Sequence, residues 1–269
     1  MKIIQLTDTH LVPPGEALRG LDPERHLRAC LAQIEAKHGD ARALVVTGDI
    51  ADRAEPAAYE LFRDLLAAYR LPPIHLTVGN HDRRSAFGQT FPQMLDRHGH
   101  AQQRFDLGDH AGILLDTWTI GTHGGALDPV RLDWLDAQFR EDGRPVLMFM
   151  HHAPFKVGLK RLDQITLANE DEFWRVIEPF CDRIRHLFFG HMHRNIAGSW
   201  RGIPFTVAAG TTHHGLLDFE ADLPRHAIVE PGYMVILVRD GTVVVHPHST
   251  RELQEVVNTP GLYPVNTAA

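Results

Sequence analysis

Short apolar runs that end in a charged or amide side chain constrain this chain more than any other feature. The clearest run covers residues 43–47 and is followed by Gly48 and Asp49. An apolar run of this length that stops at a glycine is typical of a buried strand, and open α/β sheets hold their ligands at the ends of such strands. We therefore expect Asp49 to be presented at a sheet edge and not packed in the core.

Four further runs end in the same way. The candidate strands cover residues 3–7, 74–78, 146–150 and 187–189, and the polar residues that follow them are Asp8 and His10, then Asn80, His81 and Asp82, then His151 and His152, and finally His191 and His193. Imidazole and carboxylate groups are common ligands of divalent metal ions. The five strand ends together predict a metal site.

Helical patterns fill the spaces between the early strands. Apolar residues recur at helical spacing over residues 23–39, 56–69, 129–139 and 169–180, with a shorter pattern at 87–95. A further strand is expected at 112–116, and the candidate strands after residue 186 (187–189, 205–208, 233–238 and 242–246) are separated by short loops. This order predicts an α/β core that finishes in a second, largely antiparallel sheet, with the helices outside.

Composition narrows the class of protein. The chain has 269 residues, 43% of them hydrophobic and 23% charged, and a net charge of −7, as expected for a soluble globular protein. Since no basic run is present, long nucleic acid is disfavoured as a partner. No leader or membrane span is apparent, and Cys30 and Cys181 are interpreted as free buried thiols, so a cytoplasmic location is expected.

The seven strand-end side chains can be divided between two metal ions. One ion would be held by Asp8, His10 and His193, a second by Asn80, His151 and His191, and Asp49 would be shared. A set of nitrogen and oxygen ligands without thiolates suits Mn²⁺, Fe²⁺, Co²⁺ or Zn²⁺. Two such ions, about 4 Å apart, clamp phosphoryl oxygens and make hydroxide available for in-line attack.

Two of the motifs place their ligands two residues apart. Asp8 and His10 are separated by Thr9, and His191 and His193 by Met192. Alternate side chains of an extended segment project to the same side. Both members of each pair are therefore expected to reach one metal cluster from an extended backbone.

Taken in order, the five motifs resemble the five sequence blocks of the calcineurin-like metallophosphoesterases. They are Asp8-x-His10, Gly48-Asp49, Gly79-Asn80-His81-Asp82, His151-His152 and Gly190-His191-x-His193. The likeness is closer to the bacterial class III phosphodiesterases, which include cyclic 3′,5′-nucleotide phosphodiesterases and glycerophosphodiesterases. It covers roughly residues 1–210 and implies a four-layer α/β/β/α sandwich with a dinuclear centre.

The resemblance also implies roles for residues near the metals. His81 would not bind metal but would face the scissile phosphate and help the leaving oxygen depart, with Asp82 orienting it or a neighbour. His151 is favoured as the ligand over His152, which would support it or line the pocket. The substrate-binding residues would be Asn80, His81, His193 and His213. An exposed loop position is the alternative for His214 and, with less weight, for His213.

The sequence does not decide the oligomeric state or the substrate. Residues 1–214 are interpreted as the catalytic core, and residues 215–269 as a cap or dimerisation segment that also holds the last core strands and a tail, which favours a homodimer or higher oligomer. The expected activity is hydrolysis of small phosphodiesters, either 3′,5′-cyclic nucleotides or glycerophosphodiesters. A phosphomonoesterase, a non-catalytic scaffold and a nuclease are the alternatives.

Overall fold

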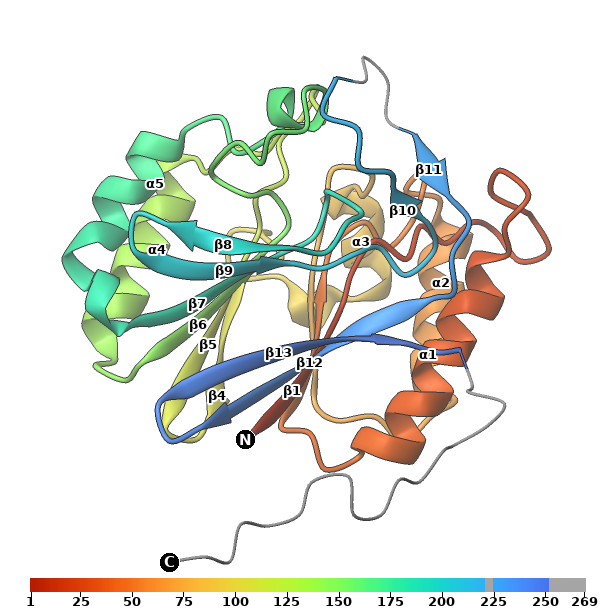
Figure 1. Cartoon of the computed structure of the whole chain (residues 1–269), viewed down its shortest axis with the longest axis horizontal. Coiled ribbons are helices and arrows are strands. Elements are labelled where there is room, and N and C mark those ends of the chain that lie inside the picture. The colour runs from red at the N-terminus through yellow and green to blue at the C-terminus, as the bar shows by residue number, and fades with distance from the viewer. Residues whose placement is uncertain (221–224, 252–269) are drawn as a thin grey trace, which may run out of the picture.

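Two β-sheets form the centre of the molecule. The computed structural model describes residues 1–220 and 225–251. The first sheet has the strand order β13-β12-β1-β2-β3 and the second β4-β5-β6-β7-β9-β8 (Figure 1). Their bounds are Lys2–Leu6 (β1), Ala43–Thr47 (β2), Ile74–Thr77 (β3), Gln103–Leu107 (β4), His110–Leu115 (β5), Val146–Met150 (β6), Ile184–Phe189 (β7), Ile196–Trp200 (β8), Ile203–Val207 (β9), Gly232–Arg239 (β12) and Thr242–Ser249 (β13).

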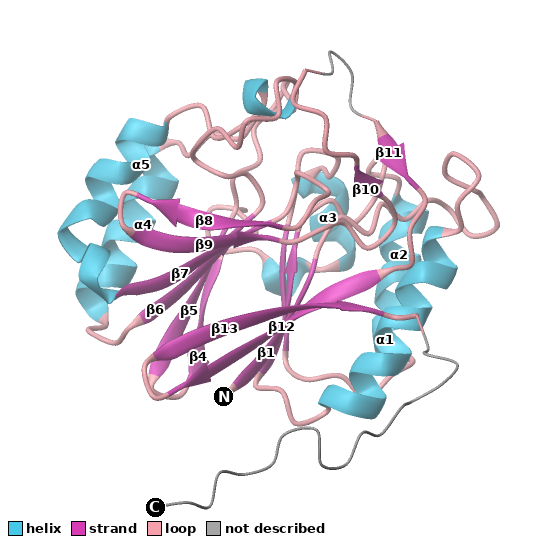
Figure 2. Cartoon of the chain, in the orientation of Figure 1, coloured by secondary structure: helices cyan, strands magenta, loops and turns pink. Residues whose placement is uncertain are grey.

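Helices cover the outer face of each sheet. They are α1 (Pro23–His38), α2 (Pro56–Ala67) and α3 (Arg84–Thr90) on the first sheet, and α4 (Pro129–Glu141) and α5 (Glu170–Ile177) on the second (Figure 2). The side chains of Asp22 and Asp128 cap α1 and α4, each followed by proline in the first turn. Three apolar cores result, one under each helical layer and one between the sheets. The expected four-layer α/β/β/α sandwich is confirmed.

The late strands depart from the expected arrangement. Strand β12 pairs antiparallel with β1, and β13 pairs with β12, so both extend the first sheet. The second sheet begins earlier, and its strands β5, β6, β7 and β9 run parallel. The prediction that the last strands form a second, largely antiparallel sheet was therefore wrong. Strands β4 and β8 were missed, and both lie at a sheet edge. The sequence of β4 is Gln-Arg-Phe-Asp-Leu and that of β8 is Ile-Ala-Gly-Ser-Trp, so neither has a long alternation of apolar and polar residues.

Parallel pairing brings the chemically important strand ends together. Strands β1, β2 and β3 run parallel in one sheet, and β6 and β7 run parallel in the other. The carboxyl ends of parallel strands share one sheet edge. The turns after these five strands therefore meet, and they carry all seven side chains proposed as metal ligands.

Other sequence expectations concern thiols and membranes. Cys30 is buried and Cys181 half-buried, and both are free thiols. Within residues 1–220 and 225–251, no helix combines the length and the apolar content needed to cross a lipid bilayer.

A buried histidine in β7 makes stability depend on pH. His186 bonds to the hydroxyl of Thr206 at 2.8 Å, and burial lowers its pKa to about 4. The folded protein therefore binds fewer protons than the unfolded chain between about pH 6.5 and 4. We expect His186 to remove about 3 kcal/mol from the free energy of unfolding as the pH falls through this window.

Replacing His186 isolates its contribution to the free energy of unfolding. The His186→Gln variant should lack it, so the difference in unfolding free energy between wild type and variant should shift by about 3 kcal/mol from pH 7 to pH 4. Urea denaturation of both proteins in EDTA measures this difference. The contributions of the other titrating groups are the same in both proteins and therefore cancel. A difference that is constant over this pH range would show that His186 is protonated equally in both states.

Candidate metal centre

The side chains predicted from the sequence meet in one buried cluster. Four ligand atoms, one each from Asp8, His10, Asp49 and His193, lie within 4.8 Å of one another. His151, His152 and His191 form a second group by the same measure. Asn80 joins the second group, since its Oδ1 lies 3.1 Å from His151 Nε2. All seven proposed ligands are less than a tenth exposed.

Asp49 lies between the two groups. Its Oδ2 atom is 3.6 Å from His10 Nε2 and 3.4 Å from His151 Nε2. Its Oδ1 atom accepts a hydrogen bond from the backbone N–H of His81 at 2.8 Å. One carboxylate oxygen is thus fixed by the backbone, while the other faces both groups, as a shared ligand would.

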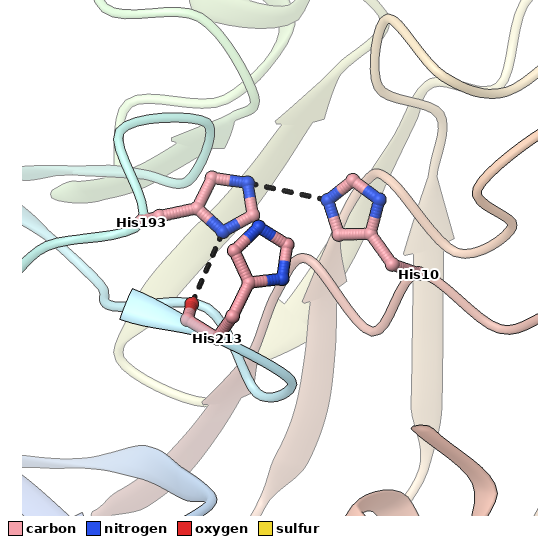
Figure 3. Close-up of side chains that lie close together, drawn as sticks. All are labelled: His10, His193 and His213. Atoms are coloured by element: carbon pink, nitrogen blue, oxygen red, sulfur yellow. Dashed lines mark hydrogen bonds between the residues drawn. The ribbon is translucent and has the colours of Figure 1, made fainter. Parts of the chain in front are cut away.

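The ring orientations of His10 and His193 bring their Nε2 atoms close together. His193 Nδ1 bonds to the carbonyl of His213 at 3.2 Å (Figure 3). His10 Nδ1 bonds to Asp52 Oδ1 at 3.0 Å. Because those partners only accept, each Nδ1 carries the hydrogen. The two Nε2 atoms lie 3.2 Å apart, so a cation bound close to both would gain two imidazole ligands.

The second group shows the same arrangement. His151 Nδ1 donates to the carbonyl of Thr47 at 2.8 Å, so Nε2 is the ring atom that faces the oxygens of Asn80 and Asp49. His191 Nε2 and Asp8 Oδ1 are buried without a hydrogen-bond partner among the described residues. Such atoms are costly unless a ligand satisfies them.

His152 differs from its neighbour. Its Nδ1 contacts the hydroxyl of Thr117 at 2.7 Å, and its Nε2 contacts the carbonyl of His123 at 3.1 Å. Both ring nitrogens are therefore engaged by the protein. This arrangement favours His151 as the ligand and His152 as its support, as the sequence analysis proposed.

The backbone of the ligand turns is not extended. Asp8, His10, Asp49, His191 and His193 all have positive φ, between 43° and 69°. L-residues with side chains rarely adopt this region, and each such residue costs about 1–3 kcal/mol unless its surroundings hold it. The expectation that alternate residues of extended segments share a side was wrong. Left-handed turns direct both side chains of each pair into the cluster.

Asp82 holds this backbone in place. Its carboxylate accepts hydrogen bonds from the N–H groups of Ile50, Ala51 and Gly79 and from the hydroxyl of Tyr59, at 2.8 to 3.1 Å. These contacts tie the turn after β2 to the turn after β3. Asp82 thus orients the backbone beside His81 and not the His81 ring.

Two residues near His81 were missed by the sequence analysis. The carbonyl of Asp52 accepts from His81 Nδ1 at 2.7 Å, and its carboxylate holds His10. His123 accepts from Asn80 Nδ2 at 3.0 Å, so the amide oxygen of Asn80 is turned toward His151. The position of Asp52, three residues after Asp49, could have indicated its role. His123 lies in a loop, and no sequence pattern indicated its role.

His213 is buried and not a loop histidine on the surface. Its ring stacks on His193 with centroids 4.2 Å apart, and it lies 5.2 Å from His10 (Figure 3). His214 is half-buried. The exposed position considered for His213 was therefore wrong, and its ring belongs to the cluster.

The donor set fits divalent metal ions. Imidazole, carboxylate and amide groups converge, His191 Nε2 and Asp8 Oδ1 have no hydrogen-bond partner among the described residues, and no described cysteine takes part. A cation would satisfy all these groups at once. The residues therefore fit one or more ions such as Mn²⁺, Fe²⁺, Co²⁺ or Zn²⁺.

Comparison with known proteins agrees with this chemistry. Residues 1–195 match the family of calcineurin-like phosphoesterases. The chain belongs to this family. A protein of Rhodopseudomonas palustris named probable cyclic nucleotide phosphodiesterase is 39% identical over 91% of each chain. One of Arcobacter nitrofigilis named probable glycerophosphodiester phosphodiesterase is 27% identical over 86% of each. The resemblance inferred from the five motifs is thus confirmed.

Solved structures support the fold of this phosphoesterase. A dimetal phosphatase from Danio rerio superposes with a TM-score of 0.69, covering 94% of this chain and 97% of its own, at 15% sequence identity. At that identity the likeness shows the fold alone.

Charged groups in the phosphoesterase site shift one another's pKa values. Burial opposes ionisation of Asp49, but the imidazoles of His151, His81 and His10 hold the pKa of its carboxyl well below the usual range. Burial likewise opposes protonation of His151, but Asp49 raises its pKa to about 9. Burial lowers the pKa of His193 to about 4. The carboxylates thus attract positive charge to the centre, and His193 stays neutral, as a metal ligand must be.

Glycine is required where the turns cross. A Cβ on Gly79 would lie 2.7 Å from Cε1 of His151 and would overlap the carboxylate of Asp49. We expect Gly79→Ala to displace both side chains and to lower kcat/KM about 100-fold or more, because ångström-scale misplacement costs that much.

The matched control is Gly143→Ala. A Cβ there meets only Arg183, at 3.9 Å. Steady-state assays of both variants, with circular dichroism to check folding, measure the difference. Equal activity of the two variants would show that the close approach at Gly79 is not needed.

Proposed function

We propose that this chain is a phosphodiesterase that uses two divalent metal ions to hydrolyse small phosphodiesters. Asp8, His10 and His193 would hold one ion, and Asn80, His151 and His191 the other. The observation that carries this proposal is the placement of Asp49 Oδ2, which lies 3.6 Å from a nitrogen of the first set and 3.4 Å from one of the second. When bound, such ions polarise phosphoryl oxygens and lower the pKa of water.

The protein's own groups prepare this centre. Asp52 and the carbonyls of Thr47 and His213 orient three of the four ligand imidazoles, those of His10, His151 and His193. Partners of this kind orient the ring and raise its basicity as a ligand. Through Gly79, Ile50 and Ala51, Asp82 keeps the turns after β2 and β3 in register.

His81 is the proposed proton donor to the leaving oxygen. Its side chain is 28% exposed, whereas the ligand histidines are buried. Because Asp52 holds Nδ1, the other nitrogen is left to face a bound diester, and a proton donated from Nε2 would neutralise the departing alkoxide. Asn80, His193 and His213 would border the same phosphate.

The proposed substrates are 3′,5′-cyclic nucleotides and glycerophosphodiesters. The more similar of the two relatives above is named for the first class and the less similar for the second, so cyclic nucleotides are the first choice. The net charge of −7 argues against long nucleic acids, which need a basic surface. We further propose a cytoplasmic homo-oligomer in which part of residues 215–269 covers the site or joins subunits.

Parallel assays test this function. Metal-stripped protein would be reconstituted with Mn²⁺ and assayed on bis(p-nitrophenyl) phosphate, p-nitrophenyl phosphate, cyclic AMP and glycerophosphoethanolamine. We expect the diesters to be hydrolysed well above the monoester, and the faster natural diester identifies the substrate class. Faster hydrolysis of the monoester, or no turnover by metal-loaded protein, would contradict the proposal.

A further inference from the structure

A small pocket opens beside the metal centre. It lies between the loop before the 3₁₀ turn Leu162–Gln164 and the short paired strands β10 (His214–Gly215) and β11 (His226–Ala227). His193 forms part of its wall, so a group bound there would adjoin the proposed metal site. The enclosed space is about 40 Å³, room for about three water molecules.

The wall of this pocket is mainly apolar. It includes Leu159, Leu162, Met192 and Leu216. Leu159 and Met192 are buried, but Leu216 is 43% exposed beside the opening. An apolar group that covered Leu216 would remove this surface from water, whereas a polyol would gain little there.

Imidazole rings connect the pocket to the metal centre. His213 stacks on His193, and His226 meets His213 edge-on with centroids 4.5 Å apart. His226 also lines the pocket. Aromatic and imidazole faces of this kind stack favourably on planar bases.

Polar groups lie at the rim. Asp218 and Arg225 form an ion pair at 3.5 Å, and both line the pocket. A carboxylate accepts from exocyclic amino groups, and a guanidinium donates to ring nitrogens and carbonyls. The rim can therefore pair with the edge of a base, and glycerol offers no such edge.

Resting on the function proposed above, we infer that this pocket is the subsite for the base of a 3′,5′-cyclic nucleotide. The phosphate lies at the metal centre, the edge of the base enters the pocket, and its face covers Leu216. Leu216 and His226 are then specificity-determining residues. The favoured substrates are nucleotides, because a glycerophosphodiester leaves this surface uncovered.

Substitution of Leu216 tests the subsite. We expect Leu216→Asn to raise KM for cyclic AMP about tenfold with kcat within twofold, since the loss falls on binding of the base. Leu216→Met should restore KM. The matched control is Leu217→Asn, which changes a neighbouring leucine that is 53% exposed and does not line the pocket. A KM for cyclic AMP that is unchanged in Leu216→Asn would overturn the inference.

Calorimetry tests binding at the subsite independently of catalysis. AMP carries a base where ribose 5-phosphate carries a hydroxyl group, and wild type loaded with Mn²⁺ should bind AMP about tenfold more tightly. Leu216→Asn should lose this preference and Leu217→Asn should keep it. Equal binding of the two ligands by wild type would overturn the subsite. Protein that prefers AMP but cleaves no diester would contradict the proposed function and still support the subsite.

Discussion

Replacing Asp49 by alanine is expected to abolish activity and to reduce the metal content from two ions to one or none. Its Oδ2 atom faces both ligand groups, so one truncation removes a ligand from each proposed ion. Loss of a residue that only supports a ligand already costs about 10–100-fold, so removal of a shared ligand should exceed about 10³-fold in kcat/KM. Metal analysis and diester assays on purified protein measure both effects.

Two further variants test whether the loss is specific to the carboxylate of Asp49. Asp49→Asn keeps the shape of the side chain but removes its charge, and should also lose metal. Asp64→Ala changes an exposed aspartate in α2 and should keep both metal and activity. If Asp49→Ala retained two tightly bound ions, Asp49 would not be shared between them.

Replacing His81 by alanine is expected to slow hydrolysis about 10²–10⁴-fold while leaving the metal content unchanged. The Nδ1 atom of His81 contacts the carbonyl of Asp52, and its backbone N–H contacts Oδ1 of Asp49. His81 lies outside both ligand groups. Since it is proposed to protonate the leaving oxygen, the loss should be largest for alcohol leaving groups and smaller for p-nitrophenolate.

The comparison of substrates decides the role of His81. His98→Ala, which changes an exposed histidine, serves as the control and should match wild type. A loss of equal size for cyclic AMP and bis(p-nitrophenyl) phosphate would mean that His81 stabilises charge on the phosphoryl group and does not donate the proton. An unchanged rate would remove it from the mechanism.

The strand ends could be predicted because they depend on local pattern. Apolar runs that stop at Gly48 or Gly190 identify a buried strand and the turn after it, and parallel strands bring such turns to one edge. The pairing of β12 with β1 could not be predicted in this way, since it joins residues more than 200 positions apart. Periodicity shows that a strand exists but does not show which sheet it enters.

The groups that support the cluster were harder to predict than the side chains that form it. Asp8 and His193 have left-handed φ, and the modest preference of aspartate and histidine for this region is too weak to identify such positions in a sequence. His123 reaches Asn80 from a loop 43 positions away. Such contacts depend on the tertiary structure, so they appear only when the two sheets are assembled.

The most direct test of a dinuclear centre is a crystal structure of Mn²⁺-loaded protein with anomalous diffraction data at the manganese edge. We expect two anomalous peaks about 4 Å apart on either side of Asp49, one beside His10 and His193 and the other beside His151 and His191. A single peak, or two peaks without Asp49 between them, would contradict a dinuclear centre that shares Asp49.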